Sequence, residues 1–358
     1  MTLIDRQQRV VTLLAEDDLD ALVICARENL RYLCGFTGSD GVLLLTRSSS
    51  RFLTDSRYTT QAQEQVTADL IEEYRLQADG VVAALRDAGA RRIGFETSLA
   101  YGKVSDLRAR GETNWEWIPL GEELESLRLV KTGAEIAAIE AATQLNALAF
   151  AEVVPLIRPG AVERELALAL EFALKQRGAE EKAFDFIVAS GPRGALPHGV
   201  ASDRRLARGE LVTIDFGCRV DGYHSDETVT VAVGSIPDEL RKVFDTVLSA
   251  HDLALSAVAP GVPLAELDRV ARECIVEAGY GAFFGHGLGH GVGLEVHEAP
   301  TVSPRSKAVV QEGMVFTVEP GIYLPGSGGV RIEDMVVATS SGARILTRIP
   351  KQYRNLLA

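Results

Sequence analysis

The stretch GHGLGHGVGLEVHE, residues 285–298, holds three of the six histidines of the chain, namely His286, His290 and His297. Two further histidines, His198 and His224, lie in ALPHGV and DGYHSDETV. His251 lies instead in an ordinary helical pattern and is expected on a helix surface or in the core. Spaced acidic residues precede and follow the histidine motifs. Glycine-rich loops often collect polar residues, but five of six histidines beside spaced carboxylates favour a metal site.

Length and composition indicate a globular protein. The 358 residues suffice for one or two domains, and a hydrophobic share of 46% supports a sizeable core. A net charge of −13 argues against a nucleic-acid partner. No apolar run approaches the roughly 18 residues of a membrane helix, and the N-terminus lacks an apolar signal segment. Four cysteines without paired spacing are typical of reduced packing residues, so we expect a cytoplasmic protein.

Residues 1–125 are expected to form a small α/β domain. Short apolar segments alternate with helical patterns, which favours a mixed or parallel sheet. The expected strands are residues 21–25, 42–45, 51–54, 92–95 and 115–119, and the expected helices are residues 6–15, 58–66 and 80–88. This part of the sequence contains no cluster of catalytic residue types.

Residues 126–358 are expected to form a second, α+β domain built from two duplicated halves. A capping box of Thr132 and Glu135 begins its first helix. Each half contains two long helical patterns, and the Pro-Gly pairs before the second helices are offset by 101 residues. The segments RGELVTIDFG and QEGMVFTVEPG then repeat a glycine, acid and glycine pattern at an offset of 104 residues. The shared order favours a duplication over the chance recurrence of Pro-Gly turns.

Four acidic residues are expected to meet where the two halves come together. Asp215 and Asp226 are predicted on facing strands of one hairpin, and Glu319 and Glu333 on facing strands of its counterpart. Burial and mutual repulsion oppose the ionisation of four neighbouring carboxylates, and divalent cations would resolve this conflict. Carboxylates with imidazole suit manganese, cobalt, iron or zinc, and five ligands suit two bridged ions about 3.5–4 Å apart. Solvated acids at strand ends are the alternative, but they would not explain acids inside apolar strands such as LVTIDFG.

These motifs resemble the pita-bread metallopeptidases, which include prolidase, aminopeptidase P and methionine aminopeptidase. The resemblance extends from Ser126 to about Tyr353 and rests on ALPHGVASD, TIDFG, DGYHSD, GLGHGVGLEVHE, VEPGIY and GVRIED. The first domain resembles the creatinase/prolidase N-terminal domain through GFTGSDG and TDSRYTTQA. That domain and the close spacing of Glu319 and Glu333 favour the Xaa-Pro peptidases over methionine aminopeptidase.

The resemblance implies a metal-dependent enzyme with two divalent ions, with manganese favoured over cobalt or zinc. It implies five metal ligands: Asp215, Asp226, His290, Glu319 and Glu333. Asp226 and Glu333 would bridge the ions, Asp215 would complete one ion, and His290 and Glu319 would complete the other. A hydroxide bridging the metals would attack the carbonyl before proline, and Glu319 would pass the proton towards the leaving nitrogen.

The resemblance also places other residues around the substrate. His198, His286 and His297 match histidines that are not ligands, and their imidazoles could donate to the substrate carbonyl or the oxyanion. Arg331 shares a strand face with Glu333 and is expected to stabilise the carboxylates without touching the metal. His224 is either structural or part of the site. The family often continues SDxTRT where this chain has Val229, which puts one local contact in doubt but not the metal ligands.

The resemblance implies Xaa-Pro peptides as substrates and a homodimer as the assembly. A dipeptidase must bind the free C-terminal carboxylate, for which an arginine near the proline subsite is suited. Arg305, in the loop between His297 and Glu319, and Arg47, at the tip of the 42–54 hairpin, are the candidates. The compact chain, without a further domain to hold a long peptide, favours prolidase over aminopeptidase P.

Two other functions stay open at this point. Non-catalytic relatives that bind peptides typically lack metal ligands, whereas all five matching residues are present here. A creatinase-like amidinohydrolase works without metals and would not need the full set.

Overall fold

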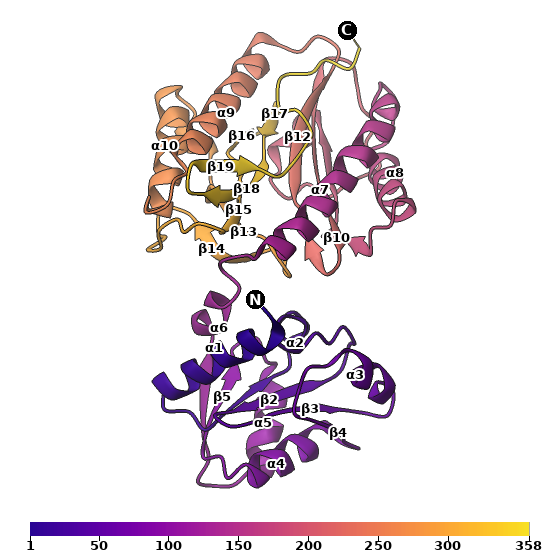
Figure 1. Cartoon of the computed structure of the whole chain (residues 1–358). Helices are drawn as coiled ribbons and strands as arrows, with labels where there is room; N and C mark the ends of the chain where they lie inside the picture. Colours follow the sequence, from indigo (N-terminus) through magenta and orange to yellow (C-terminus); the bar gives the residue numbers. More distant parts are fainter. Residues whose placement is uncertain (358) are drawn as a thin grey trace. The chain divides into compact units, whose positions relative to one another are not determined.

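The computed structural model describes residues 1–357, which form two compact units, Met1–Arg128 and a second unit that begins at Leu129 (Figure 1). Among these residues, no helix is both long enough and apolar enough to cross a membrane.

The N-terminal unit is built on a six-stranded mixed sheet of order β4-β3-β2-β1-β5-β6, as expected from the sequence. Its strands are β1 (Ala21–Ile24), β2 (Val42–Thr46), β3 (Ser50–Thr54), β4 (Leu70–Glu73), β5 (Arg92–Glu96) and β6 (Glu116–Leu120). Its helices are α1 (Leu3–Glu16), α2 (Arg27–Cys34), α3 (Thr59–Gln65), α4 (Gln77–Asp87), α5 (Tyr101–Arg110) and α6 (Glu122–Ser126). The sequence analysis did not predict α2, α5, α6 or β4. β4 is an edge strand without a buried side chain, and α2 has only eight residues, so tertiary packing rather than local pattern determines them.

The first half of the C-terminal unit places two helices against an antiparallel hairpin. Its main elements are α7 (Gly133–Val153), α8 (Glu163–Gln176), β8 (Ile187–Ser190), β9 (Glu210–Phe216) and β12 (Glu227–Val233). The expected capping box begins α7, because Thr132 Oγ1 accepts from Glu135 N and the Glu135 carboxylate accepts from Thr132 N. Val212, Ile214 and Phe216 of β9 pack into the core beside α7 and α8. Strand alternation therefore directs Asp215 to the opposite face.

The second half repeats this plan with one difference. Its elements are α9 (Asp238–Ala257), α10 (Leu264–Glu277), β13 (Gly289–Gly291), β14 (Glu298–Val302), β15 (Val315–Val318), β16 (Gly321–Leu324), β17 (Gly328–Arg331), β18 (Asp334–Thr339) and β19 (Gly342–Ile345). The expected single return strand over 330–337 is wrong. β17 pairs with β16 in a small hairpin of its own, and only β18 returns to β15. Pro320, which has no N–H to donate, follows β15 at the point where the strand ends.

Matched glycine conformations confirm the duplication. The turn before the second helix of each half has a glycine at φ 88°, the glycine after that helix lies at φ 99° or 90°, and the glycine before the ligand strand lies at φ 88° or 87°. These three pairs are Gly160 and Gly261, Gly178 and Gly279, and Gly209 and Gly313. Left-handed backbone favours glycine, so each half keeps glycine at the same three turns. α7 and α8 lie on one side of the strands and α9 and α10 on the other (Figure 1).

The two halves meet along a seam between β12 and the segment that joins β17 to β18. Thr230 Oγ1 donates to Arg331 O at 2.8 Å, and Glu333 N donates to Thr228 O at 3.2 Å. Thr228 Oγ1 also donates to the Glu333 carboxylate at 2.6 Å. The seam therefore brings the acidic residues of the two halves together, as the sequence predicted.

Candidate metal centre and active site

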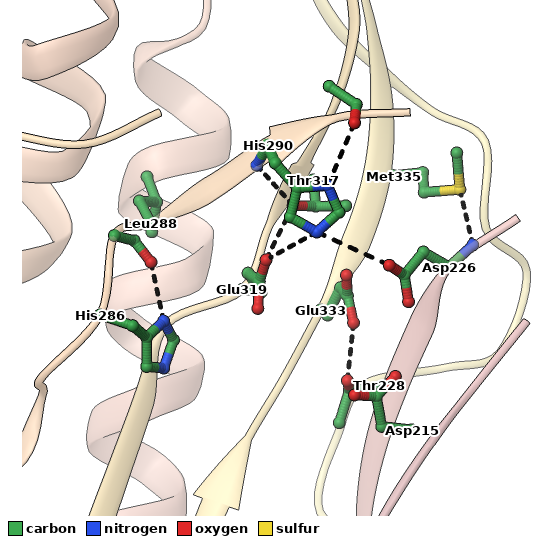
Figure 2. A network of polar contacts seen from close by, with 12 residues as sticks. Asp215, Asp226, Thr228, His286, Leu288, His290, Thr317, Glu319, Glu333 and Met335 are labelled. Atoms are coloured by element: carbon green, nitrogen blue, oxygen red, sulfur yellow. Dashed lines mark hydrogen bonds and ion pairs between the residues drawn. The ribbon is translucent and has the colours of Figure 1, made fainter. Parts of the chain in front are cut away.

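The five residues expected as metal ligands line one cavity of about 550 Å³. Asp215 lies on β9, Asp226 directly precedes β12, His290 lies on β13, Glu319 directly follows β15, and Glu333 lies between β17 and β18. The predicted placement on facing strands is wrong for three of the four acids: Asp226, Glu319 and Glu333 lie just outside the strands, and Asp215 pairs with Thr228. The labelled side chains nevertheless converge on one region (Figure 2).

The ligand atoms lie at separations that a metal ion can span. His290 Nε2 is 3.3 Å from Glu319 Oε1 and 3.6 Å from Asp226 Oδ2. Asp226, His290 and Glu333 each offer one ligand atom, and these atoms all lie within 4.8 Å of one another. Figure 2 shows the three side chains pointing towards a common point.

Neighbouring side chains orient the carboxylates. Thr317 Oγ1 donates to Glu319 Oε1 at 3.0 Å, and Thr228 Oγ1 donates to the Glu333 carboxylate at 2.6 Å. Arg331 donates to Asp215 Oδ2 at 2.6 Å. Within residues 1–357 the other oxygen of this carboxylate, Asp215 Oδ1, is buried and has no hydrogen-bond partner. A buried oxygen without a partner is costly, and a cation at this position would satisfy it.

The electrostatics of the cluster also call for cations. Burial, reinforced by the neighbouring carboxylates, raises the pKa of Asp226 and of Glu333 well above the ordinary values. Burial raises the pKa of Asp215 too, although Arg331 opposes the shift. For Glu319 burial is outweighed by the hydrogen bond and charge of His290, which lower its pKa to about 2. Several carboxylates that resist ionisation in one cavity fit divalent ions, which would favour their charged forms.

The three histidines expected around the substrate line the same cavity. The ring of His297 lies 4.2 Å from that of His290, and burial together with the charge of His290 lowers the pKa of His297. His286 contacts the chain at both ring nitrogens, with Nδ1 at 2.8 Å from Gly287 O and Nε2 at 2.9 Å from Tyr323 OH. Burial lowers the pKa of His286, so its imidazole is neutral near pH 7.

Buried acids on the helices hold the loops that carry these histidines. The Glu163 carboxylate, at the start of α8, accepts from the backbone and hydroxyl of both Ser190 and Ser202, which flank the His198 loop. On α10, Asp268 accepts from Leu288 N at 3.0 Å next to His286. Each histidine loop is thus fixed by an acid from the second helix of one half.

Arg331 and Tyr323 support the carboxylates through hydrogen bonds, and the sequence predicted only the role of Arg331. Arg331 was expected to stabilise the carboxylates, and it donates to Asp215, to Thr228 Oγ1 and to Tyr323 OH. Tyr323 lines the cavity but was missed as a functional residue. The sequence gives only one indication of this role: Tyr323 belongs to the motif VEPGIY, three residues after Pro320.

The remaining candidates divide between the two units. Arg305 lines the metal cavity, and in the described part of the chain its guanidinium makes no hydrogen bond or ion pair. Arg47, in the N-terminal unit, donates to Leu19 O at 2.9 Å and pairs with Asp18 at 3.1 Å. His224 is not among the cavity-lining residues; its backbone N–H donates to Gly293 O, so its visible role is structural.

The cavity gathers carboxylates and imidazoles, a set of side chains that suits divalent metal ions. Residues 137–340 match Metallopeptidase family M24, and residues 6–130 match the Creatinase/Prolidase N-terminal domain. The chain belongs to metallopeptidase family M24, which confirms the resemblance to the pita-bread enzymes.

Three relatives show how far the likeness extends. The chain is 38% identical to a Xaa-Pro dipeptidase of Pyrococcus horikoshii, with 97% of this chain and 98% of the relative covered. The structure of a Xaa-Pro dipeptidase from Bacillus anthracis matches with a TM-score of 0.96 at 40% identity, covering 99% of both chains. That of an X-Pro aminopeptidase from Thermotoga maritima matches with a TM-score of 0.88 at 39% identity, covering 98% of this chain and 99% of the other.

Proposed function

We propose that this protein is a prolidase, which hydrolyses the Xaa-Pro bond of dipeptides with the help of two divalent metal ions. The observation that carries the proposal is the convergence of five ligand residues in one cavity, with Asp215 Oδ1 buried and unpartnered among the described residues. The names of the dipeptidase relatives support the substrate class. Manganese is the proposed metal, because the ligands are four carboxylates and one imidazole.

Each residue of the site has a proposed task. Bound divalent cations would supply an activated water and would polarise the carbonyl before proline. Asp226 and Glu333, which lie beside each other at the seam, are placed to be shared between two ions. Neutral His297 can donate an N–H to the carbonyl oxygen as negative charge develops there. Glu319 lines the same cavity, and its carboxylate can accept a proton and release it to the leaving proline nitrogen.

The function can be tested with metal removal and a matched substrate. We expect EDTA-treated protein to lose hydrolysis of Met-Pro and to regain it when Mn²⁺ is restored. Met-Ala is the control substrate and should be cleaved poorly, because an ordinary amide N–H replaces the proline ring. Hydrolysis that survives complete metal removal, or that never appears with Mn²⁺ present, would exclude this proposal.

Aminopeptidase P activity is the second candidate, and the X-Pro aminopeptidase structure from Thermotoga maritima favours it. The two functions differ at the substrate C-terminus, since only a dipeptidase must bind the carboxylate of the proline itself. Wild-type protein is expected to cleave Met-Pro faster than Met-Pro-Ala. The reverse preference would replace prolidase with aminopeptidase P.

We propose that Arg305 rather than Arg47 binds this carboxylate, because Arg305 lies in the metal cavity and its guanidinium is free among the described residues. Arg305→Ala should lower kcat/KM for Met-Pro. The lost transition-state stabilisation should be about 1.5–3 kcal/mol, the free energy of a hydrogen bond to a charged group. The rate on Met-Pro-Ala should change little. Arg47→Ala is the matched control and should leave the dipeptide-to-tripeptide ratio unchanged. An unchanged ratio in Arg305→Ala would remove Arg305 from the substrate site.

Three further proposals come from the sequence. The domain limits are residues 1–125 and 126–358, the assembly is a homodimer, and the location is the cytoplasm. The match to the Creatinase/Prolidase N-terminal domain over residues 6–130 supports an N-terminal domain of about this length.

A further inference from the structure

A second pair of acids lies directly behind the two residues proposed to bridge the ions. Asp226 is followed by Glu227, and Glu333 is followed by Asp334, so each half carries the same doublet of ligand and neighbour. Successive residues of an extended chain point to opposite sides. Glu227 and Asp334 therefore lie away from the metal cavity, where their side chains are 0% and 6% exposed.

One lysine contacts both of these hidden acids. Lys351 Nζ lies 2.6 Å from Glu227 Oε1 and 3.4 Å from Asp334 Oδ1, and its side chain is only 5% exposed. Residues next to it add to the contact, since Ile349 N donates to Glu227 Oε1 at 3.1 Å and Thr347 donates to the Asp334 carboxylate. His251 of α9 approaches Asp334 from the other side, with Nε2 at 3.2 Å from Oδ2.

The segment that carries Lys351 is attached to both halves. Leu346 N donates to Met335 O on β18, and Leu356 N donates to Ala232 O on β12. The chain thus crosses from the second hairpin to the first behind the ligands. Lys351 contacts the residue that follows each of the two proposed shared ligands, rather than a single carboxylate. A buried charge with several hydrogen-bonding partners holds its neighbours in one geometry.

We infer that Lys351 is a positioning residue for the metal pair, which fixes the separation of Asp226 and Glu333 through Glu227 and Asp334. The inference deepens the proposed function, because it rests on these two carboxylates being shared ligands. Partners outside the ligand shell orient metal ligands, and their loss typically lowers metal affinity 10- to 100-fold. Lys351 would orient the two ligands from the side of the chain that faces away from the ions.

The test compares Lys351→Met with Lys131→Met in the full-length protein. Lys131 is a matched control: its Nζ lies 2.8 Å from Glu298 Oε1 and its side chain is 1% exposed, but it joins no bridging ligand. Metal-stripped protein is titrated with Mn²⁺ in a calorimeter, and circular dichroism verifies the fold. Lys351→Met should weaken at least one Mn²⁺ site by about 10- to 100-fold. Lys131→Met should bind Mn²⁺ as wild type does, and saturating Mn²⁺ should restore most of the Met-Pro turnover of Lys351→Met.

A second variant keeps the inference falsifiable if Lys351→Met does not fold. Glu227→Gln removes one hidden charge with little change in volume, and it should weaken Mn²⁺ binding in the same direction. Wild-type Mn²⁺ affinity in any folded Lys351→Met or Glu227→Gln protein would overturn the inference, as would an equal loss in Lys131→Met. Wild-type protein that binds two Mn²⁺ ions but does not cleave Met-Pro would instead overturn the proposed function alone.

Discussion

Asp226→Asn and Glu333→Gln should each abolish Met-Pro hydrolysis and lower the bound metal together. A shared ligand contributes to both ions, so its loss should weaken metal binding by more than the roughly 10- to 100-fold typical of outer partners. Elemental analysis of desalted protein and the rate with added Mn²⁺ measure the two effects. Asp203→Asn is a suitable control, because Asp203 is 78% exposed and pairs with Arg164 at the surface.

The stability of the metal-free variants separates metal loss from misfolding. Burial and neighbouring carboxylates raise the pKa of Asp226 and Glu333, so in the metal-free protein their charged forms destabilise the fold near pH 7. Neutral replacements should therefore unfold in urea at a concentration no lower than metal-free wild type. An Asp226→Asn protein that keeps both ions would disprove its role as a shared ligand.

His297→Ala should keep both metal ions and lose turnover. Its imidazole is proposed to donate to the developing oxyanion, and removal of one such donor typically lowers kcat by about 100- to 1,000-fold. Elemental analysis and kcat for Met-Pro are the two measurements. His297→Asn, which restores an N–H donor on a shorter side chain, should recover part of the lost rate.

The metal content of His297→Ala decides between two roles for this residue. His297 lies against His290, with the ring centroids 4.2 Å apart, so geometry alone would permit a place among the ligands. If the alanine variant lost its ions, the division between ligand and substrate histidines would be wrong.

Sequence patterns predicted most of the fold, because each half has glycine at its turns and alternating apolar residues in its strands. The convergence of Asp215 with Glu333 followed from that repeat, although they are 118 positions apart. The break between β17 and β18 was missed, because Val330, Arg331 and Ile332 have the pattern of one continuous strand. That break depends on contacts across the seam, which a local pattern does not contain.

The supporting residues were harder to find than the ligands. Tyr323 and Lys351 lie in segments that read as a turn and a chain end, and their roles come only from what they meet in space. His251 was expected on a helix surface or in the core; it is 1% exposed, and its contact with Asp334 had no sequence signal. Arg331 was found because strand alternation relates it to Glu333 over a distance of two residues.

The seam between the halves affects how strongly the protein resists unfolding. Because the proposed ligands come from both hairpins, each bound ion would act as a clasp between segments that are far apart along the chain. Opening the clasp would release the ions, so the free energy of ion binding would add to that of folding. A peptidase built in this way would become harder to unfold as the free concentration of its metal ion rises, and the added stability would grow with the logarithm of that concentration.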